Sequence, residues 1–207
     1  SSDLCEERKY MPETTAKKFA VNVLTAEAFK SIPKGSGNIL SDFSLETPKI
    51  DKTNVVHATQ GGVQITYQNT IDDTLADIDN APTNTKQGAE VSGTTATISY
   101  TTPNADPKTI QMAVGTADID PDDPTHVVAR LKTVLTDFKP LWWVGPMTGG
   151  GFLVVKILNA LSTGGLNLQT AHRGGGSMQI TLTAFSDLEN PDQAPMEFYS
   201  ITKAAEE

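Results

Sequence analysis

The sequence predicts a mainly β protein with one flanking α-helix. Threonine, asparagine, aspartate, glycine and valine recur throughout the 207 residues, a composition that favours strands joined by tight turns. Several short segments alternate apolar and polar residues, which is the period of a half-buried strand. One segment, residues 124–138, instead places its apolar residues on one face of a helix.

The first predicted elements are short and separated by turn-forming residues. Residues 1–16 are polar and mixed in charge, and we expect a flexible arm there. In residues 17–25, Phe19, Val21 and Val23 alternate with polar residues and predict a strand. Two further short strands are predicted near residues 41–45 and 51–57, with a proline between them.

The middle of the chain alternates strands with one long loop. Residues 62–69 alternate Val63, Ile65 and Tyr67 and predict a strand. Residues 70–87 are polar, lack periodicity and predict a loop of a length that is usually functional or disordered. Two more strands are predicted, at residues 90–101 and 108–116, and the proline-containing residues 103–107 form the turn between them.

The predicted helix spans residues 124–138. Its apolar side chains fall at offsets 0, 1, 4, 7, 8 and 11 from Val127, which is one face of an amphipathic helix. Aspartates before it favour the positive end of the helix dipole, Pro124 suits the first turn, and Pro140 ends the segment.

After this helix the strand pattern returns and continues to residue 202. Trp142 and Trp143 are adjacent in the strand predicted at residues 141–145, so they point to opposite faces. One indole is expected in the core, and the other against the helix, a loop or another subunit. The remaining predicted strands are residues 152–161, 166–172, 178–186 and 197–202. With no internal repeat, residues 17–202 form one predicted domain, followed by a short tail at 203–207.

Composition excludes several classes of protein. The single cysteine, Cys5, cannot form an intrachain disulfide, so a disulfide-built secreted module is not expected. No apolar run approaches the ~20 residues of a membrane span, and the sequence therefore predicts a soluble protein, without a membrane anchor, made in a reducing cytoplasm.

The net charge of −9 is unevenly distributed. Tight binding to nucleic acid requires lysine or arginine on phosphates, and basic residues are sparse here, so a surface that grips DNA is disfavoured. The ordinary interpretation of the acidic stretches is solvated loops; the alternative is a surface that repels nucleic acid. The acidic residues form two clusters: Asp72, Asp73, Asp77 and Asp79, and then Asp118, Asp120, Asp122 and Asp123.

No catalytic or metal-binding pattern emerges from the sequence. His57, His126 and His172 lie far apart and outside metal-ligand spacing. The glycine-rich residues 145–151 and 174–176 lie between strands, where hairpin turns are the simpler interpretation. We therefore expect neither an enzyme nor a cofactor or metal site.

Residues 152–201 carry a resemblance to a known family. Two apolar strands, FLVVKILNAL and MQITLTAFSD, flank the turn Thr163-Gly164-Gly165 and a polar strand, and a last strand follows Pro195. This order resembles the major tail protein, or tail tube protein, of long-tailed (siphovirus-type) bacteriophages, which is related to the type VI secretion tube protein.

The resemblance implies a β-sandwich or partly closed barrel with one flanking helix. It further implies a structural virion protein that forms hexameric rings, stacked into a hollow tube through which DNA passes without specific binding. The implied partners are other copies of the chain and tape-measure, tail terminator and baseplate or tip proteins. The implied location is the virion, after assembly in the host cytoplasm.

By the same analogy, residues 70–87 are the candidate ring-stacking loop, and residues 1–16 and 203–207 are candidate arms. Either or both acidic clusters are candidates for the wall of the channel. Trp142, Trp143 and Arg173 are candidate contacts between subunits.

Two other functions compete with the tail tube. The first is another ring-forming component of a tail, baseplate or secretion tube. The second is a monomeric β-sandwich that binds carbohydrate or a receptor, with Trp142 and Trp143 as its platform.

Overall fold

The computed structural model describes residues 25–202. The arms predicted at residues 1–16 and 203–207, Cys5, and all but the last residue of the strand predicted at 17–25 lie outside the described residues.

One antiparallel sheet of nine strands organises the described chain, in the order β2-β1-β7-β8-β10-β4-β3, with β11 on β8 and β9 on β10. A separate pair, β5 and β6, accompanies it. The strands are β1 (Asn38–Leu40), β2 (Val55–His57), β3 (Gln60–Asp73), β4 (Ala89–Thr102), β5 (Ala117–Ile119), β6 (Val127–Ala129), β7 (Lys139–Pro146), β8 (Phe152–Ser162), β9 (Asn167–Ala171), β10 (Gly174–Ala184) and β11 (Met196–Ile201).

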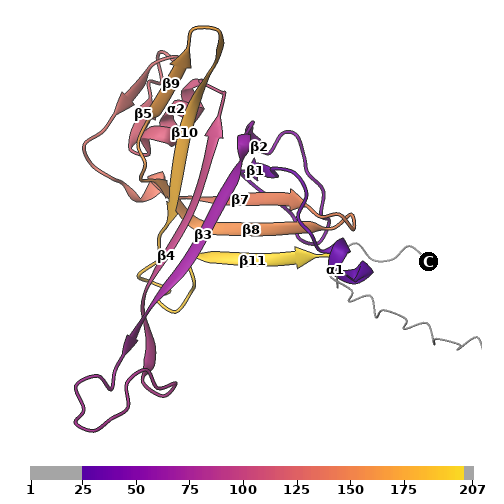
Figure 1. The fold of residues 1–207 in the computed structure, drawn as a ribbon. Coiled ribbons are helices and arrows are strands. Elements are labelled where there is room, and N and C mark those ends of the chain that lie inside the picture. Colours follow the sequence, from indigo (N-terminus) through magenta and orange to yellow (C-terminus); the bar gives the residue numbers. More distant parts are fainter. Residues whose placement is uncertain (1–24, 203–207) are drawn as a thin grey trace, which may run out of the picture.

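The sheet is bent at β8. The first half of β8 pairs with β11, from Phe152 to Ile157, and its end pairs with β10, from Ala160 to Ser162. Figure 1 shows the result: β7, β8 and β11 lie along one axis, while β3, β4 and β10 cross them steeply. The main apolar core is shared between these two halves of the sheet.

Trp142 and Trp143 mark the two faces of β7. Trp143 is 7% exposed and belongs to the main core, where its Nε1–H donates to the carbonyl of Ser36 at 3.1 Å. Trp142 is 8% exposed and lies in a second cluster with Phe43 and Val154, beneath the segment at residues 41–54. The predicted opposite orientation of the two indoles is confirmed.

The main helix is α2 (Pro107–Val114), where the sequence analysis predicts a strand at residues 108–116. That prediction is wrong. The Asp106 side chain accepts a hydrogen bond from the amide of Thr109, Pro107 starts the first turn, and Gly115 ends the helix. These are ordinary start and stop signals, and they outweigh a short apolar pattern that fits either structure. A shorter helix, α1 (Ala26–Lys30), was not predicted.

The prediction of a helix at residues 124–138 is also wrong. The chain there forms β6, a loop and a single 3-10 turn, η1 (Leu135–Asp137). Val127 and Val128 pair with β5, opposite Ile119 and Asp118. Valine and threonine account for six of the 15 residues in this segment, and their branched side chains lower helix propensity and favour strands. An apolar repeat of helical period therefore did not produce a helix.

The other strand predictions agree with the structure to within a few residues, except at residues 41–45. There the chain forms a loop, with Phe43 and Leu45 packed over the second cluster, and the strand is β1 just before it. The mainly β prediction with one principal flanking helix is confirmed, although the helix is α2. The described strands form an open, bent sheet rather than a closed barrel.

Gly115 provides a test of the junction between α2 and the sheet. Its φ is +81°, and an added Cβ would lie 2.7 Å from the carbonyl oxygen of Ser162. Gly165 has a similar φ of +67° but open space around the same position. The backbone conformation costs a non-glycine residue about 1–2 kcal/mol. We expect Gly115→Ala to lower the free energy of unfolding clearly more than Gly165→Ala in urea titrations; equal losses would contradict this packing.

A buried pair, His57 and Tyr100, joins β2 to β4. The His57 Nε2 lies 2.5 Å from the Tyr100 hydroxyl, which also contacts the sulfur of Met112 in α2. Burial lowers the pKa of His57, an effect that the nearby charge of Asp106 only partly offsets. Burial also raises the pKa of the Tyr100 hydroxyl. The folded protein therefore holds both groups in their neutral forms.

This pair predicts a pH dependence of stability. Because the pKa of His57 is lower in the folded state than its ordinary ~6.5 in the unfolded chain, the unfolded state binds more protons below that pH. Stability is fully present above pH ~6.5 and falls as the pH decreases toward the folded pKa, by at most about 1.4 kcal/mol per pH unit. Urea unfolding should be measured across this pH range for the parent protein and for His57→Gln. The free energy of unfolding should decrease with decreasing pH in the parent but not in the variant.

Candidate assembly interface

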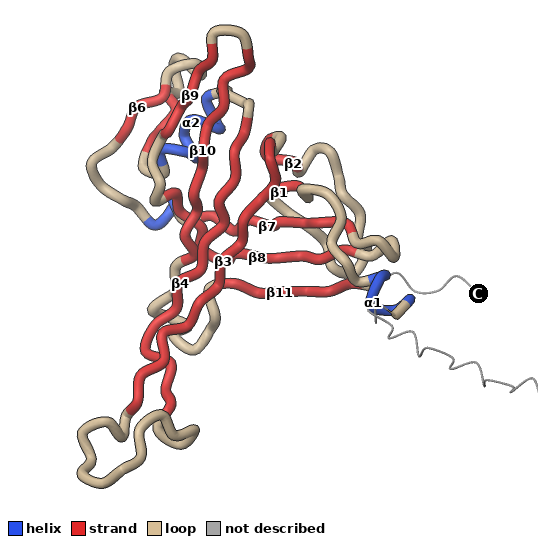
Figure 2. Tube along the Cα trace, viewed as in Figure 1, coloured by secondary structure: helices blue, strands red, loops and turns tan. Residues whose placement is uncertain are grey.

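A long β-hairpin, β3–β4, projects from the body of the subunit. Each strand has 14 residues, so the hairpin extends about 46 Å at ~3.3 Å per residue. Near the body, Val63, Ile65 and Ile98 contact the main core. Farther out, residues 67–72 and 89–95 are exposed on both faces. Figure 2 shows this distal half and its terminal loop extending beyond all other elements.

The distal hairpin lacks the packing that normally stabilises a two-stranded ribbon. Isolated two-stranded hairpins are marginal in water, and stable ones rest on a third strand or another apolar surface. Here the cross-strand pair Ile71 and Val91 is 63% and 53% exposed. Ile78, in the terminal loop, is 56% exposed. Exposed apolar side chains at the end of a projecting hairpin are candidates for a surface that is covered in an assembly.

The loop at residues 74–88 is ordered by the carboxylate of Asp73. One oxygen accepts the amide hydrogen of Leu75 at 3.0 Å, and the other accepts that of Asn84 at 2.9 Å. Thr74 closes the base of the loop, because its amide donates to the carbonyl of Gly88 at 2.8 Å. The sequence analysis identified this loop by its polarity, but it did not identify Asp73 as its anchor.

The second acidic cluster lies on the β5–β6 hairpin and is largely engaged in local contacts. Arg130 contacts Asp118 at 2.5 Å and also pairs with Asp137, a buried carboxylate that the sequence analysis missed. Asp120 accepts the amide hydrogen of Asp122, and this lowers its pKa together with the nearby His126. The hydroxyl and amide of Thr125 likewise lower the pKa of Asp123.

The two acidic clusters occupy opposite ends of the subunit. Figure 1 places β5 in the upper lobe beside α2, and the β3–β4 loop at the far lower end. Asp72, Asp77 and Asp79 are exposed, and none of their carboxylates makes a hydrogen bond or ion pair within residues 25–202. The first cluster therefore presents the less neutralised charge.

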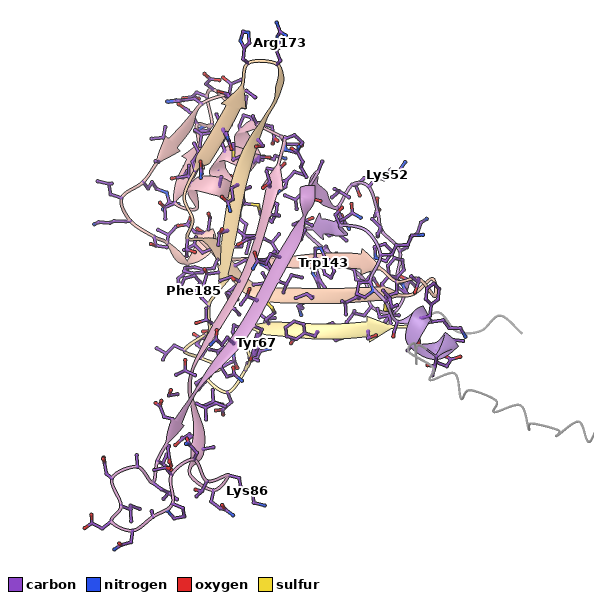
Figure 3. All side chains as sticks on the ribbon, viewed as in Figure 1. Lys52, Tyr67, Lys86, Trp143, Arg173 and Phe185 are labelled. Atoms are coloured by element: carbon purple, nitrogen blue, oxygen red, sulfur yellow. The ribbon has the colours of Figure 1, made fainter. Side chains whose placement is uncertain are left out.

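The three candidate contacts between subunits have different surroundings. Trp142 and Trp143 are buried within the subunit. Trp142 stacks on Tyr199, and the Lys156 ammonium lies 5.0 Å from its ring centroid. Arg173 is exposed in the turn between β9 and β10, at the tip of the upper lobe in Figure 3. Only Arg173 is accessible to a neighbour without rearrangement.

Within residues 25–202 no three histidine, cysteine, aspartate or glutamate side chains are arranged to hold a metal ion. The helices of this same region are too short or too polar to span a bilayer.

Comparisons with known proteins give matches in structure only. No family model matches the sequence, and no curated protein matches it. Among solved structures, a chain in the virion of a native gene transfer agent (GTA) particle is similar with a TM-score of 0.41 and 13% identity, covering 79% of this chain and 95% of that one. A chain in the tail of an empty GTA particle, determined with C6 symmetry, has a TM-score of 0.39 and 13% identity over 73% and 92% of the two chains.

Asp73 provides a test of the terminal loop. Asp73→Ala removes the acceptors of two backbone hydrogen bonds, each of which contributes about 1 kcal/mol. We expect proteases to cut residues 74–88 several-fold faster in this variant, with little change in the melting temperature of the body. The matched control is Asp79→Ala, which removes an exposed carboxylate of the same loop; equal cleavage of the two variants would contradict the anchoring role.

Proposed function

We propose that this chain is a structural subunit of a bacteriophage tail that self-assembles into stacked, hexameric rings and forms the hollow tail tube through which DNA passes. The observation that carries the proposal is the projecting β3–β4 hairpin, whose residues beyond the contact of Tyr67 with Phe198 are largely exposed on both faces. The resemblance of residues 152–201 to tail tube proteins is consistent with the same role.

Unpaired sheet edges support self-association. Among the described strands, β3 pairs only with β4, and β11 pairs only with β8, so one edge of each is open. Open edges are a hazard in a monomer but become useful when a neighbouring copy pairs with them. A heterologous contact of this type closes into a ring or repeats along an axis. Both geometries are required for a stacked tube.

The charge of the chain suits a channel for DNA. With a net charge of −9, the surface repels phosphates at distances within the Debye length, about 8 Å at physiological salt. We propose that acidic side chains from the two clusters contribute to this field. Tape-measure, terminator and baseplate or tip proteins are the proposed partners, the virion is the proposed location, and the proposed role is structural rather than enzymatic.

A carbohydrate-binding module is less well supported. Such a module requires an accessible aromatic platform, and Trp142 and Trp143 are each less than a tenth exposed. Another ring-forming component of a tail or baseplate remains the second candidate, because open edges and a projecting hairpin serve it equally.

Shortening the hairpin tests the proposal. We expect the purified parent protein to form rings and tubes at high concentration, seen by negative-stain electron microscopy. Replacing residues 74–88 by a two-residue Asn-Gly turn retains the Asp73–Ala89 pairing and supplies a favourable hairpin turn. This variant should keep its melting temperature within a few degrees but form no tubes. A parent that stays monomeric at all salt and protein concentrations would contradict the proposed function.

A further inference from the structure

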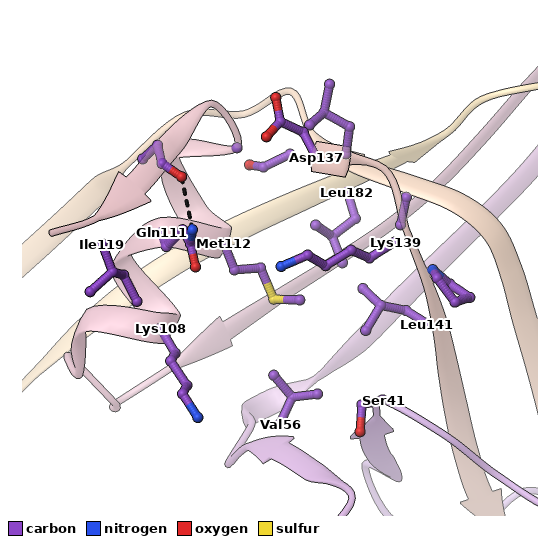
Figure 4. Close-up of a pocket in the computed structure, with 16 residues that line it drawn as sticks. Ser41, Val56, Lys108, Gln111, Met112, Ile119, Asp137, Lys139, Leu141 and Leu182 are labelled. Atoms are coloured by element: carbon purple, nitrogen blue, oxygen red, sulfur yellow. Dashed lines mark hydrogen bonds between the residues drawn. The ribbon is translucent and has the colours of Figure 1, made fainter. Parts of the chain in front are cut away.

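An apolar cavity of about 360 Å³ lies between α2, β5 and the start of β7. Its volume is in the range of binding pockets, ~300–1,000 Å³. Its apolar walls come from separate elements: Val56, Met112, Ile119, Leu141 and Leu182. Figure 4 shows their side chains around the opening, with Lys139 reaching across it toward Met112.

Two lysines give the cavity a cationic rim. Lys108 of α2 and Lys139 of β7 both line the cavity, are exposed, and form no ion pair within the described residues. Asp137 lines it too, but its carboxylate already pairs with Arg130. The cavity therefore favours an apolar group flanked by carboxylates.

The same subunit carries an apolar side chain that is flanked by two carboxylates. Ile78 lies between Asp77 and Asp79 in the terminal loop of the β3–β4 hairpin, and all three are exposed. Its position is set by two turn hydrogen bonds, from the Ile78 amide to the Leu75 carbonyl at 3.1 Å and from the Ala81 amide to the Ile78 carbonyl at 3.2 Å. The hairpin presents an isoleucine between two aspartates on an ordered loop.

The two features lie at opposite ends of the molecule, so they do not meet within one copy. α2 and β5 are in the upper lobe of Figure 1, and the hairpin tip is at the lower end. We propose that Ile78 of one copy inserts into the apolar cavity of the next copy, with Asp77 and Asp79 against Lys108 and Lys139. This inference deepens the proposed tube assembly and rests on it, because it identifies the surface that receives the hairpin.

Two other exposed leucines have a charged residue on each side, and both are weaker occupants. Leu131 is fully exposed but lies between Arg130 and Lys132, whose charges repel the lysine rim. Leu188 is 93% exposed between Asp187 and Glu189, so its flanking charge is suitable. It lies, however, in a short turn closed by the Asp187–Asn190 bridge, and no projecting hairpin extends this turn toward another copy. Leu188 is therefore a matched control.

The first experiment compares two substitutions by electron microscopy and by sedimentation of tubes. Ile78→Asp should reduce the sedimenting fraction at least tenfold and leave the melting temperature of the subunit unchanged, because the side chain is exposed. Leu188→Asp places the same charge beside another exposed apolar residue and should assemble like the parent. If Leu188→Asp blocks assembly and Ile78→Asp does not, the cavity takes the turn at residue 188, and the inference is overturned.

A charge exchange tests direct contact. Lys108→Glu with Lys139→Glu should weaken stacking, and so should Asp77→Lys with Asp79→Lys. Combining all four substitutions restores opposite charges across the contact and should recover most of the lost assembly. If the double variants lose assembly and the quadruple variant does not recover it, the inference is overturned. The proposed function stays intact in that case, because the parent protein still assembles. A parent that never assembles would instead remove the proposed function and, with it, this contact.

Cross-linking gives an independent measurement. In a Cys5→Ser background, Ile78→Cys combined with Ile119→Cys should form covalent oligomers on mild oxidation of assembled tubes. Leu188→Cys combined with Ile119→Cys should remain monomeric on denaturing gels. The reverse pattern would overturn the inference.

Discussion

Strand β8 is the element on which both halves of the sheet depend. It pairs with β7 along one edge and, on the other, with β11 and then with β10. Its side chains alternate between the two apolar clusters, with Val154 in one and Val155 and Ile157 in the other. Since burial of an aliphatic side chain contributes about 1.5–3 kcal/mol, this alternation stabilises both faces at once. The bend in β8 then sends β10, and β4 and β3 beyond it, in a different direction from β7.

This change of direction explains how the hairpin leaves the body. β4 is held by β10 only from residue 97 onward, and its first residues continue past the core with β3 as their single partner. Threonine-rich, two-sided polar strands stay hydrated there, and charged residues at an edge limit uncontrolled pairing. We therefore expect the aspartates near the tip to limit aggregation of the exposed ribbon, independently of the proposed assembly.

Much of the sheet could be predicted from the sequence because alternation is local. Residues 62–69 alternate plainly, residues 152–161 form an apolar run of strand length, and both lie in strands. The adjacent indoles of β7 were correctly assigned to opposite faces for the same reason. Both errors in helix placement arose where the pattern fits two structures, and cap residues or branched side chains decide the outcome. Asp106 and Pro107 carried the start signal for α2 in a stretch interpreted as a turn, and Gly115 carried the stop signal in a stretch interpreted as a strand.

The candidate interface was less predictable, because it depends on distances between remote segments. The polarity of residues 70–87 identified the loop, but nothing local shows that Asp73 anchors it or that Lys108 and Lys139 line one cavity. Those lysines are 31 positions apart in sequence and line one cavity only because α2 packs against β8 and β10, close to the start of β7.

The proposed contact also changes the expected origin of the channel's charge. Aspartates that lie against lysines are largely neutralised and cannot contribute much field to a lumen. If Asp77 and Asp79 are used between copies, the acidic wall of the channel must come from other carboxylates. In the second cluster, Asp118 shares the single positive charge of Arg130 with Asp137, and Asp122 has no basic partner among the described residues. The acidic residues of this chain would then serve two separate purposes, one at the joint between copies and one along the path of the DNA.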